Sequence, residues 1–146
     1  MGAHGEDGQV NENQWQEKRK FQRINVSFTI MYKVNSPLTV RMVAGEKKEA
    51  AIALDISEGG MGVLISYDIP ISTIVTVKFA MVNLDTSRVE DQYHSMELEG
   101  EVRYSFYVKE KNAYRLGVHF INISNDERNF IATFVKSLSA KRKNHE

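Results

Sequence analysis

Six segments of this chain alternate apolar and polar residues with a period of two, and the final segment changes to a helical period. Alternation with a period of two is typical of a strand that places one face on a hydrophobic core. The predicted strands cover residues 24–32, 49–56, 61–66, 74–82, 96–106 and 113–121. Six short strands separated by turn residues predict a fold that is mainly β.

The alternation also assigns each strand side chain to the core or to the outer face. In 96–106 the apolar positions predicted to face the core are Met96, Leu98, Val102, Tyr104 and Phe106. In 49–56 the same rule places Ile52, Leu54 and Ile56 on the core. Asp55 and Ser57 are therefore expected to point outward. In 113–121 the outward positions include Arg115 and His119.

The segments between the strands contain residues that favour turns. Residues 34–48 are predicted to form a long loop, which begins with turn residues at Asn35-Ser36-Pro37. The run Ser57-Glu58-Gly59-Gly60 is predicted to join its two strands tightly, because glycine and serine suit short turns.

A capping-box pattern marks the change of period near the end of the chain. Ser124 is placed to cap the first helical turn, and Glu127 is placed to reach back to it. The apolar residues that then recur at helical spacing are Phe130, Ile131, Phe134, Val135 and Leu138. Because this stripe must pack on the sheet, the predicted architecture is a six-stranded antiparallel β-barrel with a C-terminal amphipathic α-helix.

The length of 146 residues suits one domain that needs no metal or disulfide to hold its core. Residues 1–17 are acidic, contain several glycines and are nearly free of aliphatic side chains, so we expect a disordered acidic tail. The β-barrel domain with its helix is expected over residues 18–140, and a basic tail over 141–146. Cysteine is absent, which excludes disulfides, thiolate metal sites and a cysteine nucleophile.

Charge and hydropathy narrow the choice of partners. The chain has 19 basic and 19 acidic residues, so a general electrostatic attraction to nucleic acid is not expected. No uncharged apolar run approaches the ~20 residues that span a bilayer. The first residues lack the basic and apolar regions of a signal peptide. We therefore expect a cytoplasmic protein with no membrane span.

The sequence offers few combinations of residues that could form a catalytic or metal site. The four histidines lie near the termini, in a loop and on the polar face of a strand, and no two have metal-ligand spacing on one element. No nucleophile elbow, P-loop or zinc-protease motif is present. We interpret the three glutamates at 97–101 as a solvated strand face and not as a paired acid and base. The sequence therefore predicts neither an enzyme nor a cofactor.

Two short motifs stand out together. The first is R-x-x-x-R, formed by Arg19 and Arg23 before the first strand, and the second is D-x-S-x-x-G, formed by Asp55, Ser57 and Gly60. With the run Tyr114-Arg115-Leu116-Gly117-Val118-His119-Phe120 near the end, these motifs resemble the PilZ domain family over about residues 18–138. That family consists largely of bacterial receptors for cyclic di-GMP, and its β-barrel with a helix agrees with the architecture predicted here.

The resemblance assigns five of these residues to the ligand, namely Arg19, Arg23, Asp55, Ser57 and Gly60. Their chemistry agrees with this assignment. Arginine suits both guanine O6/N7 and phosphate, an ionised aspartate accepts from guanine N–H groups, and Ser57 can donate to a phosphate. Gly60 would let the ligand approach the backbone. The competing interpretation is that Asp55 and Ser57 only close a turn in which the two glycines supply positive φ.

The stoichiometry depends on a further cation. Lys18 directly precedes Arg19, and its charge favours an intercalated dimer of cyclic di-GMP, which carries four phosphate charges. The alternative is that Lys18 pairs with the acidic tail, an exposed interaction of ~0–1 kcal/mol. Arg103 and Arg115 also face outward and could reach the ligand, although nothing in their spacing requires it.

Three classes of function remain open. The leading one is a cyclic di-GMP receptor that changes shape and relays the signal to a downstream protein effector. The second is a PilZ-like interaction adaptor that does not depend on nucleotide. The third is a small β-barrel binder of single-stranded nucleic acid. The neutral net charge and the lack of a visible exposed aromatic platform argue against nucleic acid as a partner.

Overall fold

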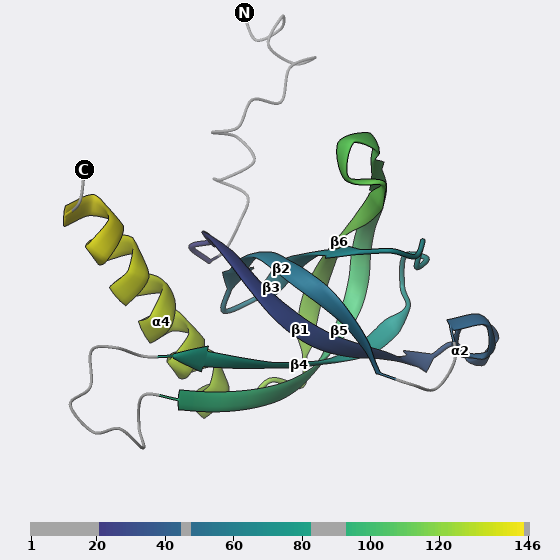
Figure 1. The fold of residues 1–146 in the computed structure, drawn as a ribbon. Coiled ribbons are helices and arrows are strands. Elements are labelled where there is room, and N and C mark those ends of the chain that lie inside the picture. Colours follow the sequence, from purple (N-terminus) through teal and green to yellow (C-terminus); the bar gives the residue numbers. More distant parts are fainter. Residues whose placement is uncertain (1–20, 45–47, 83–92, 145–146) are drawn as a thin grey trace, which may run out of the picture.

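The computed structural model describes residues 21–44, 48–82 and 93–144 of the chain. Six antiparallel strands close into a barrel in the order β1-β2-β3-β6-β5-β4 (Figure 1). The strands are β1 Ile24–Ser36, β2 Glu49–Ser57, β3 Gly60–Ile65, β4 Ile74–Val82, β5 Tyr93–Val108 and β6 Ala113–Ile121. The predicted six-stranded antiparallel barrel is confirmed.

The segment from residue 34 to 48, predicted as a loop, contains a strand end and a short helix, so that prediction was wrong. β1 continues to Ser36 because Val34 keeps the alternation, is buried and pairs with β4. Helix α2, Leu38–Ala44, then begins after Pro37, whose carbonyl accepts two amide hydrogen bonds from the first turn. Proline is tolerated here because the start of a helix does not need its missing N–H.

Helix α4, Asn125–Asn144, begins where the sequence predicts. The Glu127 amide donates to Ser124 Oγ at 3.1 Å, and the Ser124 amide donates to Glu127 Oε1 at 3.0 Å, so the capping box is present. Ile131 and Val135 are buried in the core of the barrel, as the predicted apolar stripe requires. Figure 1 shows the helix along one side of the barrel. Neither this helix nor any other within the described ranges is long and apolar enough to cross a membrane.

A β-bulge on β2 changes which of its side chains form the core. The pairing with β3 shifts register between Ala53 and Asp55. Before the bulge Ala51 and Ala53 are buried, whereas Ile52 is exposed and Leu54 is half-buried. The prediction that Ile52 and Leu54 face the core was therefore wrong. Asp55 still lies on the outer side, because the extra residue shifts the alternation by one position.

A second bulge, on β5, exchanges the inward-facing and outward-facing positions of the strand beyond Val102. The register with β6 shifts between Val102 and Tyr104. Tyr104 and Phe106 consequently lie on the outer face, where they are 37% and 52% exposed and stand opposite Gly117 and Arg115. The prediction that both aromatic side chains face the core was wrong, and so was the expectation that the chain lacks exposed, neighbouring aromatic side chains. One added residue moves every following side chain to the other face.

Candidate functional site

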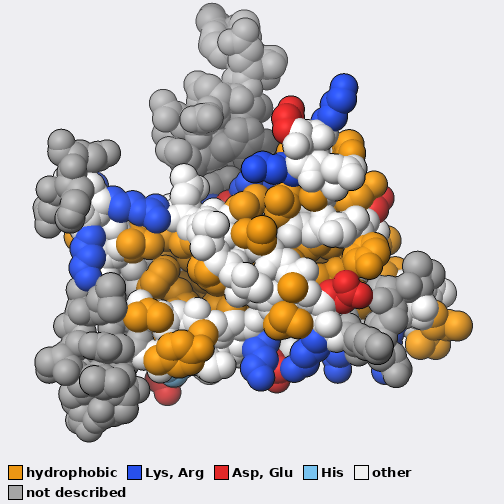
Figure 2. Space-filling model, in the orientation of Figure 1, with side chains coloured by type: hydrophobic (Ala, Val, Ile, Leu, Met, Phe, Trp, Pro, Cys, Tyr) orange, Lys and Arg blue, Asp and Glu red, His pale blue; other side chains and the backbone are white. Residues whose placement is uncertain are grey.

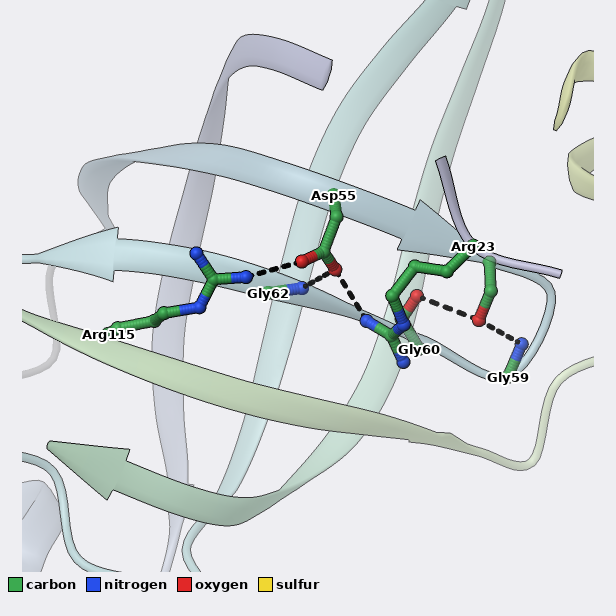
Figure 3. A network of polar contacts seen from close by, with 7 residues as sticks. Arg23, Asp55, Gly59, Gly60, Gly62 and Arg115 are labelled. Carbon is green, nitrogen blue, oxygen red and sulfur yellow. Dashed lines mark hydrogen bonds and ion pairs between the residues drawn. The ribbon is translucent and has the colours of Figure 1, made fainter. Parts of the chain in front are cut away.

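The Asp55 carboxylate is the centre of a polar cluster on the outer face of the barrel (Figure 3). Its Oδ1 accepts hydrogen bonds from Arg23 Nη1 at 2.5 Å and from the Gly62 amide at 2.9 Å. Its Oδ2 accepts from Arg115 Nη2 at 2.5 Å. Asp55 is only 4% exposed, and a buried carboxylate needs such partners because removing an unpaired charge from water is costly. Asp55 therefore holds together two guanidinium groups that are far apart in the sequence.

Ser57 closes the turn between β2 and β3. Its Oγ accepts a hydrogen bond from the Gly59 amide at 3.1 Å and donates to the Gly60 carbonyl at 3.5 Å. The side chain is buried. The turn interpretation thus accounts for the present contacts of the hydroxyl, and a phosphate contact by Ser57 stays a prediction.

Gly60 allows two strands of the barrel to approach closely. It pairs with His119 on β6, and a Cβ atom at position 60 would lie 2.2 Å from the Val118 carbonyl oxygen. At Gly59 a Cβ would instead meet the ring of Phe21 at 2.7 Å. Neither glycine has a φ between +20° and +160°, so the part of the turn interpretation that required a left-handed backbone was wrong. The need for glycine at position 60 is steric and comes from β6.

Four of the residues assigned from the sequence lie together around this turn, namely Arg23, Asp55, Ser57 and Gly60. Lys18 and Arg19 lie outside the described residues, as does the tail expected at 1–17, so these assignments stay predictions. The sequence left open whether Arg115 belongs to the site, and its bond to Asp55 places it in the cluster. Arg103 pairs with Glu101 instead, at 2.8 Å.

The cluster carries more positive than negative charge. Arg23 and Arg115 share the single charge of Asp55, and their side chains are 26% and 31% exposed. Nε of Arg23 is buried and has no hydrogen-bond partner within the described part of the chain. Burial alone would lower the pKa of Arg115, but its contacts with Tyr104 and Asp55 raise that pKa above its usual value. The arrangement can therefore bind an anion through paired guanidinium N–H donors.

His119 lies beside the turn, opposite Gly60 in the register of β3 and β6. Loss of hydration lowers its pKa, and the charges of Arg103 and Arg128 lower it further, against the opposing effect of the Glu101 charge. The imidazole is therefore neutral at pH 7, and it can donate or accept a hydrogen bond without adding charge.

Sequence reasoning missed two aromatic side chains beside the cluster. Tyr104 lies against the backbone of β6, since a Cβ at Gly117 would lie 2.0 Å from its ring. Its ring stacks on that of Phe106, with centroids 5.8 Å apart. The usable signal was the density of aromatic residues at 104–107, which exceeds what one narrow core face needs. Strict alternation concealed it, because the alternation assumed an unbroken strand.

Metal ligation has no support in the described ranges, where no three histidine, cysteine, aspartate or glutamate side chains are grouped closely enough to hold an ion. Arg23, Asp55 and Arg115 instead form a cationic, partly exposed surface beside the turn between β2 and β3.

The protein is a small β-barrel domain. Its barrel of six antiparallel strands is closed, a C-terminal helix flanks it, and a polar cluster lies on its outer face. A family model for the PilZ domain matches residues 17–137, and the chain belongs to this family. The match spans both sequence motifs and all six strands of the barrel.

Solved structures share this fold. The Bacillus subtilis inhibitor of motility, MotI/DgrA, has a TM-score of 0.66 at 11% identity, covering 85% of this chain and 52% of that one. The PilZ domain of Escherichia coli YcgR with c-di-GMP has a TM-score of 0.57 at 16% identity, covering 88% and 96%. The K. pneumonia MrkH–c-di-GMP complex has a TM-score of 0.60 at 11% identity, covering 88% and 56%. The chain thus spans about half of MotI and MrkH but nearly all of the YcgR domain. No curated protein matches the sequence.

Proposed function

We propose that this PilZ domain is a receptor for cyclic di-GMP. The observation that carries the proposal is that one buried carboxylate, Asp55, holds Arg23 and Arg115 with part of each side chain open to solvent. Cyclic di-GMP presents two phosphates and two guanine edges, and an arginine can bind either group with paired N–H donors. The YcgR and MrkH structures with the same fold are complexes with c-di-GMP, which supports this choice of ligand.

Within this proposal Asp55 is first a positioning residue. Its two oxygens already accept three hydrogen bonds, and a carboxylate has about four lone-pair sites. One site therefore remains for a guanine N–H. Ser57 is available to a phosphate because its bond to the Gly60 carbonyl, at 3.5 Å, is at the limit of hydrogen bonding.

The residues before the barrel complete the proposed site. Arg19 and Lys18 add two positive charges to those of Arg23 and Arg115, which favours two molecules of cyclic di-GMP bound as an intercalated dimer. The site recognises the ligand and has no role in changing it covalently. A receptor of this kind would act in the cytoplasm, where it relays the signal to a downstream protein effector.

Calorimetric titration with cyclic di-GMP tests the proposal. We expect saturable binding of two ligands per chain, falling toward one in Lys18→Ala, and no binding of GTP or a short single-stranded oligonucleotide. Binding of the oligonucleotide alone would support the nucleic-acid alternative, and binding of none of the three would support the adaptor. A ratio of one ligand per native chain would contradict binding of the intercalated cyclic di-GMP dimer, but it would not contradict the receptor function.

The relay is inferred from the contacts of three consecutive residues. Arg23 belongs to the Asp55 cluster, whereas the two residues before it contact helix α4. Gln22 Nε2 donates to Ser139 Oγ on that helix at 3.2 Å. The guanidinium of Arg128, also on α4, lies 5.3 Å from the centroid of the Phe21 ring. A ligand that moves Arg23 would therefore change the contacts of residues 21 and 22 with α4. The effector would then bind the helix differently in the two states.

Hydrogen exchange with and without cyclic di-GMP measures this coupling. We expect the amides of residues 18–23 to gain protection on binding, and amides near Ser139 to change in the same titration. Gln22→Ala, combined with Phe21→Ala, should keep the response at the arm but weaken the response in α4. A helix whose exchange is identical in both states would contradict the relay while leaving binding unaffected.

A further inference from the structure

A pair of exposed aromatic rings lies on the outer face of β5. Tyr104 and Phe106 stack with their centroids 5.8 Å apart and their planes inclined by 18°. They are among the large hydrophobic side chains exposed at the surface, where Figure 2 shows hydrophobic groups interspersed with lysine and arginine. The bulge after Val102 is what turns both rings outward. Bulges are over-represented at sheet edges, at the rims of barrels and next to active sites, where they re-aim side chains.

Arg115 connects this aromatic pair to the Asp55 cluster. Its backbone stands directly opposite Phe106 in the register of β5 and β6, and its guanidinium is bonded to Asp55. Directly opposed side chains on one face of a sheet are neighbours, with Cβ atoms about 4.5–5.5 Å apart. A single arginine side chain therefore spans the interval between the exposed ring and the carboxylate.

The aromatic pair of Tyr104 and Phe106 packs against the backbone of β6. Because Gly117 has no Cβ, the Tyr104 ring lies directly against this strand. Phe106 rests on Tyr104 and keeps about half of its surface open, at 52% exposed. An open ring face held by a neighbour is a surface on which a flat base can stack with little loss of side-chain freedom.

We propose that Tyr104 and Phe106 form a stacking platform for one guanine base of the cyclic dinucleotide, with Phe106 in contact with the base. This inference rests on the proposed function and extends its site beyond the two sequence motifs. The arginines bind phosphates and base edges, whereas the platform binds the face of a purine. Arg115, which lies between the two parts, is placed to contact the phosphate that joins them.

The two parts of the site differ in what they select. Stacking tolerates any base because every base has a π-face, so the platform contributes affinity for a nucleotide over a simple anion. Recognition of guanine in particular falls to the hydrogen-bonding edge contacts of arginine and aspartate. Loss of the platform should therefore weaken binding without changing which cyclic dinucleotide is preferred.

Calorimetry on the full chain tests the platform with matched aromatic variants. Phe106→Ala should bind cyclic di-GMP about tenfold more weakly, which corresponds to about 1.4 kcal/mol. Tyr93→Ala is the control, because Tyr93 is exposed and lies at the far end of the same 16-residue strand. It should bind as the native chain does. Native binding with an unchanged affinity in Phe106→Ala would overturn the platform alone, whereas absence of binding to the native chain would overturn the proposed function.

A fluorescence measurement keeps the test valid should the alanine variant fold poorly. Trp15 is the only tryptophan, so Trp15→Phe combined with Phe106→Trp places a single indole on the platform. Stacking of guanine on that indole should quench its emission as cyclic di-GMP is added. Trp15→Phe with Tyr93→Trp should show no quenching. Binding by calorimetry without quenching at position 106, or quenching by a single-stranded oligonucleotide alone, would overturn the proposal.

Discussion

Replacing Arg23 by alanine should weaken cyclic di-GMP binding by at least about 2 kcal/mol, or roughly thirtyfold, while the barrel stays folded. The variant removes a guanidinium whose Nε is buried and unpaired in the described part of the chain, and with it the charge-assisted bonds offered to the ligand. The fold survives because Asp55 keeps its bonds to Arg115 and to the Gly62 amide. Calorimetry gives the affinity, and a thermal melt reports the fold.

Two further variants make this result specific. Arg41→Ala removes the same charge from helix α2, beyond the far end of β1, and should bind as the native chain does. Arg19→Ala is expected to resemble Arg23→Ala. Tight binding that survives in the Arg19→Ala, Arg23→Ala double variant would end the receptor hypothesis.

Replacing Gly60 by alanine should lower the free energy of unfolding by about 3 kcal/mol, an effect at the upper end of those seen for overpacking. The added Cβ would lie 2.2 Å from the backbone carbonyl of Val118 and 3.2 Å from the Cα of His119. A backbone contact of this kind cannot be relieved by a change of rotamer, so β3 and β6 would have to separate. Urea denaturation monitored by circular dichroism measures the loss.

The neighbouring glycine supplies the control for this steric argument. In Gly59→Ala the new Cβ comes too close only to the ring of Phe21, which can move aside, and lies at an ordinary 3.8 Å from Ser57 Oγ. We expect a change in stability within about 1 kcal/mol. Equal losses at the two positions would show that the turn itself, and not the approach of β6, requires glycine. Gly59→Ala should also disturb the contact of Phe21 with Arg128, and so the inferred coupling to α4.

Most of the fold could be predicted because its signals are local. All six strands and the final helix were located by periodicity, and the capping pair of Ser124 and Glu127 marked the start of the helix correctly. The failure at 34–48 has a local cause as well. The run Asn35-Ser36-Pro37 predicts a turn, whereas in the structure the Pro37 carbonyl accepts the first hydrogen bonds of helix α2. Proline is compatible with both structures, and the sequence does not distinguish them.

The candidate site was only partly predictable. The D-x-S-x-x-G motif located Asp55 and the β2–β3 turn, and the alternation on β6 put Arg115 on the outer face as the structure does. What could not be predicted is that Arg23 and Arg115 share one carboxylate, because they are separated along the chain and meet only when β6 pairs with β3. The resemblance also assigned Gly60 to the ligand, and that contact stays a prediction. The close contact that the structure shows at this position is with β6.

The sequence by itself determined where the strands and the helix lie, because side-chain period and helix caps act over a few neighbouring residues. Tertiary structure decided which side chains face outward after Ala53 and after Val102, because a bulge exists only in the pairing of two strands. It likewise decided the contacts of Asp55, since a buried carboxylate takes whichever donors the closed barrel brings to it. The aromatic pair at Tyr104 and Phe106 illustrates the difference. The two aromatic residues can be seen in the sequence. Their exposure, however, follows from the register shift between β5 and β6, which no local sequence pattern indicates.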